Sequence, residues 1–361
     1  MEPSSRPDDE RRRPRIVFAL MSAVAPVAAV DELAMALAPH TVLVHHDFSQ
    51  QPDFPLSAPN VVFVPEPMRT GWAVFGFVEG IFHTLRHACR ELEFDYLQLL
   101  SPSCLPIKSM AHFEAHVGGP EEAHFDCIDL LADRDALMSV GYRAFTPEAS
   151  LRHRVARRLS MEYFGPEHDR RDEAGIWLRS GGRAGVLPLA ARGLVHALSH
   201  PAIGRHPFGE DLRPYYGSAW FGARRRVVEA LVDEFAKPQL RDYFSRLRIA
   251  EEFLLPTLLM QAAGRSRGPS NHYVHRFDEA HAGLLQEQDL NLLREQPAFF
   301  ARKFPVDVEA PVRRRVIQAL CQDDARAAAP PASTRAASPR PLDVHPGERA
   351  LHAATLGVKR A

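Results

Sequence analysis

Residues 15–47 read RIVFALMSAVAPVAAVDELAMALAPHTVLVHHD, and this stretch decides the fold class. It holds two short apolar runs rich in β-branched residues, Arg15–Leu20 and Thr41–His45, each typical of a buried strand. Between them, Asp31 is a candidate cap for a helix over Asp31–Leu37, which gives way to Pro39. The order strand, helix, strand with short connections predicts an α/β fold.

The same alternation continues to about residue 110. Val61–Val64 is another apolar run, Phe75–Leu92 has apolar residues at helical spacing, and Asp95–Leu100 returns to strand character. We therefore expect an open, mostly parallel sheet flanked by helices. Ligands of such sheets bind at the carboxyl ends of the strands, which here are His45–Asp47 and Ser101–Cys104.

The composition excludes several classes of protein. Lys+Arg 44 against Asp+Glu 45 leaves a net charge of -1, so no global charge attracts nucleic acid or a membrane surface. The four cysteines show no C-x-x-C spacing, which argues against zinc and a disulfide framework. No apolar run approaches the roughly 18 residues of a membrane span. We expect a cytoplasmic protein with at most peripheral contact at the inner membrane face.

The segment Ala250–Gly264, AEEFLLPTLLMQAAG, is the candidate for the chemistry. Because proline is tolerated only in the first turn of a helix, Pro256 predicts a helix from near Phe253 to Gly264. Glu251 and Glu252 would then lie at the N-terminus of a buried helix, where the dipole keeps a carboxylate ionised, as a general base requires. Taken alone, such a pair more often consists of ordinary N-terminal helix charges.

Seven segments occur in an order that resembles one enzyme family. They are VHHD (Val44–Asp47), NVVFV (Asn60–Val64), Trp72, FDYLQLLSPSCLPIKS (Phe94–Ser109), GSAWF (Gly217–Phe221), EEFLLPT (Glu251–Thr257) and FARKF (Phe300–Phe304). Over residues 16–308 the chain resembles the core-2/I-branching β-1,6-N-acetylglucosaminyltransferase and peptide O-xylosyltransferase family. FARKF and Phe94–Ser109 are the most specific segments.

The resemblance implies a GT-A-type nucleotide-sugar glycosyltransferase fold with a Rossmann-like, mostly parallel sheet. It also implies inverting transfer of GlcNAc or a related sugar, possibly xylose, from a UDP-sugar to a hydroxyl of a glycan or glycolipid, in cell-surface polysaccharide or glycoconjugate synthesis. No cofactor or metal is expected. Such a displacement needs one carboxylate to take the acceptor proton and positive charge for the departing diphosphate.

The resemblance also assigns residues. Glu252 is the expected base, because it lies five residues before Thr257 as the family glutamate does before its threonine. Lys303 matches the lysine that contacts the diphosphate, with Arg302 as a second cation. The other expected site residues are His45, Asp47, Ser101 and Arg276 for the nucleotide-sugar, and Trp220, Trp72 and Ser218 for acceptor or sugar stacking.

Several positions depart from the family pattern. Cys104 replaces an aspartate, Pro102 replaces a glycine, and Ala73–Val74 replace two glycines. Ala219 stands where xylosyltransferases carry an acidic residue, which leans away from xylose. The changes at Cys104 and Pro102 leave open a nucleotide-sugar-binding protein without transferase activity. Asp133–Asp135 leaves open a metal-dependent enzyme, although this D-x-D does not end a strand.

The domain organisation follows from composition and from the extent of the resemblance. Residues 1–14 and 323–361 are predicted to be disordered tails. Residues 15–322 form one expected glycosyltransferase domain, with a nucleotide-binding half at 15–130 and an acceptor and catalytic half at 131–322. Val186–Leu198 is a candidate helix in this second half. Neither the acceptor nor the oligomeric state follows from the sequence.

Overall fold

The computed structural model describes residues 13–22, 24–130, 211–245, 247–274 and 281–328, with shorter pieces at 169–171, 177–179, 190, 207–209 and 277–278. Arg276, the candidate helix Val186–Leu198 and the D-x-D at Asp133–Asp135 lie outside the described residues, as do residues 1–12 and 329–361 of the two predicted tails. Within the described part, no helix combines the length and apolarity that a membrane span requires.

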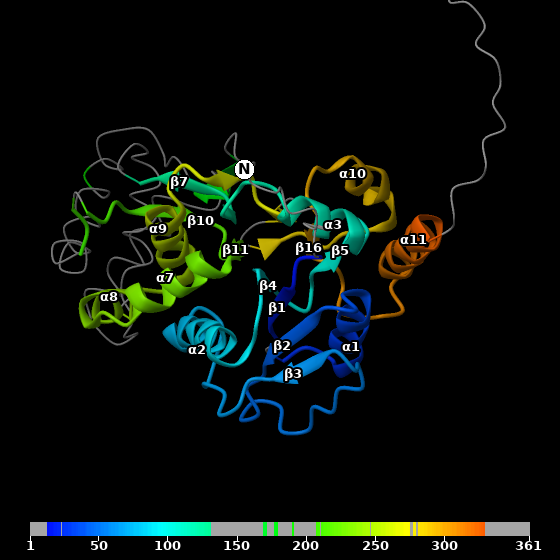
Figure 1. Cartoon of the computed structure of the whole chain (residues 1–361), viewed down its shortest axis with the longest axis horizontal. Coiled ribbons are helices and arrows are strands. Elements are labelled where there is room, and N and C mark those ends of the chain that lie inside the picture. The colour runs from blue at the N-terminus through cyan, green and yellow to red at the C-terminus, as the bar shows by residue number, and fades with distance from the viewer. Residues whose placement is uncertain are drawn as a thin grey trace, which may run out of the picture.

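A seven-stranded sheet forms the centre of the molecule (Figure 1). Its order is β12 (Arg267–Gly268), β6 (Ala123–His124), β11 (Gly222–Arg224), β4 (Tyr96–Leu100), β1 (Ile16–Met21), β2 (Thr41–His45) and β3 (Val61–Phe63). β1 runs parallel to both β2 and β4, while β11 runs antiparallel between β4 and β6. The predicted α/β class with a mostly parallel sheet is confirmed.

The strand order places a switch point beside β1. The chain builds outward from β1 through β2 to β3, then returns to add β4 on the other side of β1. In open α/β sheets, the carboxyl ends of the strands beside such a reversal form a natural crevice for a ligand. The structure therefore directs attention to the residues that follow β1, β2 and β4.

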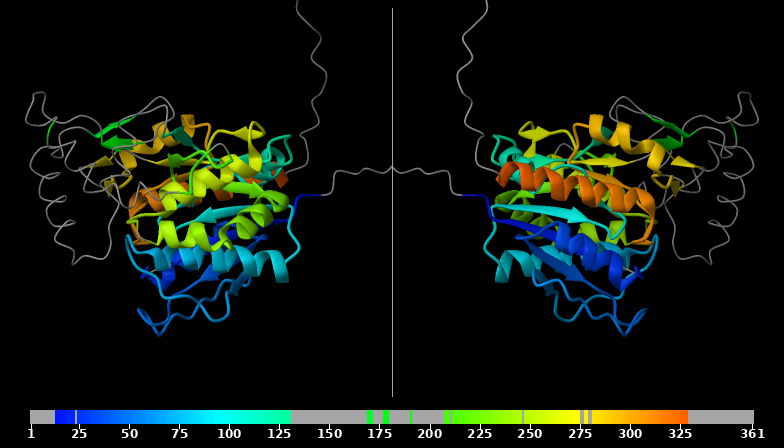
Figure 2. Two further views of the ribbon diagram at one scale, coloured as in Figure 1. Left: turned by 90° about the vertical axis from the view of Figure 1, so that its left-hand side faces the viewer. Right: turned by 90° about the vertical axis from the view of Figure 1, so that its right-hand side faces the viewer.

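Helices cover both faces of the sheet. The side chains of β1 alternate between the two faces and are apolar on each, so each face needs a covering layer. Val17, Ala19 and Met21 pack with the first layer, which contains α2 (Phe75–Glu91), α7 (Arg225–Phe235) and α9 (Glu251–Ala263). Ile16, Phe18 and Leu20 pack with the second, which contains α1 (Val27–Ala36), α3 (Met110–Val117) and α11 (Pro311–Ala328). The two layers lie on opposite sides of β1 and β4 in Figure 1, and Figure 2 shows them from two other sides.

A smaller sheet extends beyond the carboxyl end of β4. It has the order β13 (His272–Val274), β16 (Phe300–Arg302) and β5 (Leu105–Pro106). Phe304 N–H donates to the Ser103 carbonyl at 2.8 Å, so the FARKF segment lies directly against the turn after β4. The remaining described elements are β7 (Cys127–Asp129), β10 (Tyr215–Gly217), β8 (Asp169–Arg171), β9 (Trp177–Arg179), β14 (Phe277–Asp278), β15 (His281–Ala282), α8 (Pro238–Phe244), η2 (Glu287–Asp289) and α10 (Leu290–Glu295).

Two predicted helix starts are wrong. α1 begins at Val27, so Asp31 lies inside the helix, where its carboxylate accepts hydrogen bonds from the backbone N–H groups of Ser57 and Ala58. α9 begins at Glu251 and accommodates Pro256 in its interior. Tertiary packing of its apolar side chains outweighs the hydrogen bond that proline cannot donate. Its end was predicted correctly, since Gly264 follows the helix with a φ of 56°.

Arg313 of α11 is a fully buried cation that joins this helix to α1 and to the segment at Pro305. Its guanidinium donates to Glu32 Oε1 at 2.8 Å, to the Pro305 carbonyl at 2.9 Å and to the Ala29 carbonyl at 3.4 Å. Arg313→Ala is expected to lower the free energy of unfolding by about 3 kcal/mol, because it leaves these acceptors without their donor. Urea denaturation measures this.

Arg314→Ala is the matched control for that experiment. Arg314 neighbours Arg313 on the same helix, but it is exposed and pairs with the exposed Glu309. Loss of a surface ion pair changes stability by less than about 1 kcal/mol. Equal effects of the two substitutions would contradict the structural role of Arg313.

Candidate functional site

Arg302, at the end of β16, is the point where the expected site residues meet. Its guanidinium carbon lies 4.6 Å from the centre of the Trp220 ring, in cation–π geometry. Burial lowers the pKa of Arg302, while the nearby Cys104 and Glu252 raise it. Segments that lie far apart in the chain thus converge at the carboxyl edge of the main sheet.

Glu252 is held in place by β10. Its Oε2 accepts a hydrogen bond of 3.0 Å from the Tyr216 hydroxyl. Five residues further along α9, the Thr257 hydroxyl accepts from Tyr215 N–H at 3.0 Å and donates to the Tyr215 carbonyl at 3.2 Å. The spacing between glutamate and threonine therefore has a physical reason: both side chains bind adjacent residues of one strand. Glu251 lies beside Glu252 and is buried.

Tyr216 is a site residue that the sequence interpretation missed. The residue is buried, and its ring also packs on Phe253, with 4.9 Å between ring centres. It directly precedes the segment Gly217–Phe221, so its position in the sequence was a usable signal. Because its hydroxyl donates to the carboxylate, Tyr216 orients the Glu252 side chain.

The turn after β4 remains ordered despite its two unusual residues. Cys104 Sγ accepts from Ser101 N–H at 3.4 Å and lies 3.2 Å from Ser101 Oγ, while Cys104 N–H donates to the Ser101 carbonyl at 2.9 Å. Sulfur thus takes the acceptor position that a carboxylate oxygen could occupy. Pro102 stands at the second position of this turn, where proline is favoured.

His45 and Asp47 are buried at the end of β2 and hold the following loops. His45 Nε2 accepts from Met68 N–H at 3.0 Å, and Asp47 Oδ2 accepts from Thr70 N–H at 2.7 Å. Burial would raise the pKa of the Asp47 carboxyl, but hydrogen bonds from Ser49, Thr70 and Gln50 outweigh it and keep that pKa well below its usual value. Direct contact with uracil or ribose stays a prediction.

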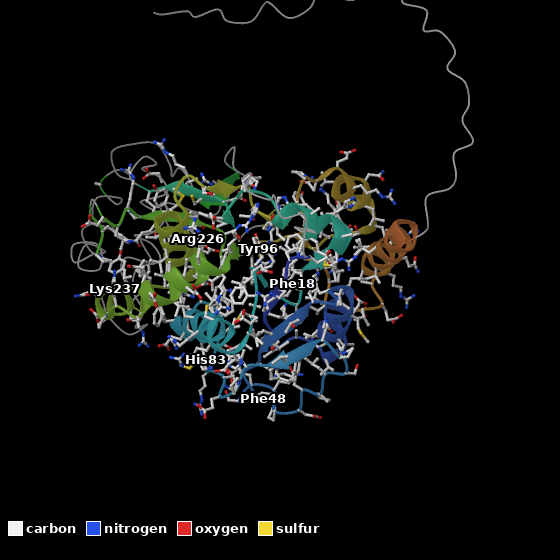
Figure 3. The ribbon with its side chains drawn as sticks, in the orientation of Figure 1. Phe18, Phe48, His83, Tyr96, Arg226 and Lys237 are labelled. Carbon is white, nitrogen blue, oxygen red and sulfur yellow. The ribbon has the colours of Figure 1, made fainter. Side chains whose placement is uncertain are left out.

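These loops lie at one end of the molecule. Figure 3 labels His83 and Phe48 at its lower edge, below the middle of the sheet. The His83 ring lies 6.1 Å from that of His45, and the Phe48 ring lies 5.8 Å from that of Phe63 on β3. Of the residues expected on the nucleotide side, His45 therefore lies beside an aromatic ring of α2, and the neighbour of Asp47 in the chain, Phe48, lies beside β3.

The two expected stacking tryptophans differ in access. Trp72 is 72% exposed, with the Arg248 guanidinium 5.6 Å from its ring centre. Trp220 is only 8% exposed, because it packs against Arg302. Ser218 Oγ accepts from Trp220 N–H at 3.2 Å and so shapes this loop. Trp72 remains the better candidate for stacking on a sugar, whereas Trp220 holds the cation.

Lys303 follows Arg302 and is half-buried. Its carbonyl accepts from Leu285 N–H at 2.9 Å, which fixes the backbone. Within the part of the chain that the structure describes, its ammonium has no ion-pair partner. Among the same residues, no group of three or more His, Cys, Asp or Glu side chains could hold a metal ion.

Buried histidines make the stability of the fold depend on pH. Burial lowers the pKa of His45 and His124 from 6.5 to about 4, and that of His272 to about 3. As pH falls below 6.5, these rings take up protons in the unfolded chain while they stay neutral in the folded one. The unfolded state then binds more protons, so stability is complete above pH 6.5 and is lost as pH falls towards 4.

We therefore expect the free energy of unfolding to decrease by about 3 kcal/mol or more between pH 7 and pH 4.5. Urea denaturation at a series of pH values measures it. His124→Gln removes one titrating ring and should make the dependence shallower. A flat profile over this range would contradict the assignment of neutral buried histidines.

Comparisons with known proteins found no family model that matches this chain and no curated protein that matches its sequence. The functional proposal therefore rests on the resemblance of the motifs and on the geometry of Glu252, Arg302 and Trp220.

Proposed function

We propose that this protein is an inverting, metal-independent glycosyltransferase with a GT-A-type fold. It moves GlcNAc or a related sugar from a UDP-sugar to a hydroxyl of a glycan or glycolipid acceptor. One observation supports the proposal above all. Glu252 accepts a hydrogen bond from Tyr216 and interacts electrostatically with Arg302 at the carboxyl edge of a mostly parallel sheet. A base and a cation are the two groups that this displacement needs.

The reaction is a single displacement at the anomeric carbon. The acceptor oxygen attacks that carbon, and Glu252 takes the proton of the acceptor hydroxyl. The bond between the anomeric carbon and the β-phosphate oxygen breaks, and its electron pair leaves with UDP. Arg302 and Lys303 stabilise the negative charge that develops on the diphosphate.

The local structure suits Glu252 to the role of base. It lies in the first turn of α9, where the helix dipole favours a negative charge. A carboxylate oxygen can accept more than one hydrogen bond, so the bond from Tyr216 leaves capacity for the acceptor hydroxyl. The half-buried position of Glu252 keeps it within reach of a bound substrate.

Release of UDP from UDP-sugars in the presence of candidate glycans tests the proposal. Turnover that is insensitive to EDTA supports it, whereas EDTA-sensitive turnover favours a metal-dependent enzyme using Asp133–Asp135. Binding of UDP-sugars without turnover favours a nucleotide-sugar-binding protein. Thermal stabilisation by a panel of UDP-sugars identifies the donor, because a ligand that binds the native state raises its stability.

A further inference from the structure

His272 of β13 shares one face of the small sheet with Arg302 of β16. The parallel register pairs His272 with Phe300 and Val274 with Arg302. Because side chains alternate along a strand, His272 and Arg302 point to the same side. Trp220 contacts both, with its ring centre 6.2 Å from the His272 ring and 4.6 Å from the Arg302 guanidinium carbon.

A buried hydrogen-bond network determines which nitrogen of His272 carries the proton. Gln98 Nε2 donates to the Phe221 carbonyl at 2.7 Å, and Gln98 Oε1 accepts from Asn271 Nδ2 at 2.9 Å, so the amide orientation is fixed. The same Nε2 lies 3.4 Å from His272 Nδ1, which must be the acceptor. A neutral imidazole then carries its proton on Nε2.

The rest of this network is also well held. Asn271 Nδ2 donates to the Tyr96 hydroxyl at 2.9 Å, and His116 Nε2 lies 2.9 Å from Asn271 Oδ1. Tyr96 is labelled near the middle of the molecule in Figure 3. Gly222 of β11 leaves room for it, because a Cβ there would meet the Tyr96 hydroxyl. The network is therefore rigid, and it fixes the His272 ring at the Nδ1 atom.

Two buried nitrogens on this face lack an acceptor. Among the described residues, His272 Nε2 and Arg302 Nε are buried and have no hydrogen-bond partner. His272 as a whole is only 6% exposed. A buried N–H without an acceptor costs about 1–3 kcal/mol. Two such donors on one face, one of them on a permanent cation, suit an anionic oxygen.

We propose that His272 is a neutral hydrogen-bond donor to the diphosphate of the bound nucleotide, acting beside Arg302. The identity of the anion rests on the proposed transferase function, in which negative charge develops on the diphosphate near Glu252. The burial and the neighbouring Arg302 charge that lower the pKa of His272 to about 3 keep the ring uncharged. A neutral donor orients the phosphate oxygen without repelling Arg302.

Two substitutions isolate the donor. His272→Phe keeps a ring against Trp220 and Phe300 but removes the N–H, whereas His272→Gln keeps an N–H donor at similar reach. Titration calorimetry with UDP, inorganic pyrophosphate and uridine measures the affinities. We expect His272→Phe to lower the affinity for UDP and for pyrophosphate by about tenfold and to leave the affinity for uridine unchanged. His272→Gln should retain most of the affinity for UDP and pyrophosphate.

A second measurement on the wild-type chain does not depend on folding of the phenylalanine variant. In protein labelled with ¹⁵N-histidine, the Nε2–H resonance that is missing from the His272→Gln variant should shift when pyrophosphate is added. A resonance that does not move would overturn the proposal. Equal weakening of UDP and uridine by His272→Phe would do the same, because it would indicate a purely structural role.

The outcomes separate this proposal from the proposed function. If the His272→Phe variant turns over UDP-sugars and binds UDP as tightly as the wild type, His272 does not contact the diphosphate. The proposed transferase function is then unaffected. Binding of pyrophosphate that depends on His272, without any preference for UDP or turnover, supports the anion site and overturns the transferase. A wild-type chain that binds none of these anions overturns both.

Discussion

Glu252→Gln is expected to lower the rate of sugar transfer by about a thousandfold, within the range that loss of a general base costs. The amide has nearly the same shape and can still accept the hydrogen bond from Tyr216, so α9 and β10 should keep their arrangement. What it cannot do is take the proton of the acceptor hydroxyl. UDP affinity should therefore stay within about twofold of the wild type.

Glu251→Gln is the matched control, because Glu251 is adjacent on the same helix but Tyr216 donates to Glu252. Rates of UDP release and calorimetric titration with UDP, measured on both variants, distinguish the two carboxylates. Near-normal turnover in Glu252→Gln, or an equal loss in Glu251→Gln, would remove Glu252 from the role of base. The electrostatic interaction between Glu252 and Arg302 would then need another explanation.

Lys303→Ala is the second large effect that we expect. It should slow transfer by about a hundredfold and weaken UDP binding by about tenfold, because one of two cations beside the leaving group is lost. Uridine lacks the diphosphate, so its affinity should not change. Lys303→Arg keeps the charge and should recover part of the rate.

Lys237→Ala provides a control for the general loss of positive charge. Lys237 is exposed, pairs with Glu234 at 2.5 Å, and lies at the edge of the molecule in Figure 3, away from Tyr96. Its removal should leave both UDP affinity and turnover unchanged. If the two lysine variants bind UDP equally well, Lys303 does not contact the diphosphate.

Local patterns were sufficient for much of the fold. The alternation of apolar runs and helical periodicity in residues 15–110 predicted the α/β class, and the end of α9 at Gly264 was predicted correctly. The predictions that failed concern helix starts. Asp31 was read as a cap because its partner, the backbone of Ser57, is distant in sequence. Pro256 was read as a first-turn residue because packing energy is not visible in local propensity.

The candidate site was only partly predictable. The resemblance to the family motifs selected Glu252, Arg302 and Lys303, but it could not show that Trp220 packs on Arg302 rather than facing outward. Nor did any pattern single out His272, since a histidine in a short strand is common. Its role in the proposed site depends on Gln98, which lies 174 residues earlier in the chain.

The sequence by itself determined the class of fold, the segments that carry candidate chemistry and the residue types available there, because periodicity, turn chemistry and motif spacing are local properties. The tertiary structure alone decided which of these residues meet. Pairing of β16 with β5 and β13 joins segments far apart in the chain, and only that pairing places Arg302 beside Cys104, Glu252 and Trp220. Partners, burial and pKa values depend on such non-local contacts, so they arise only when the chain has folded.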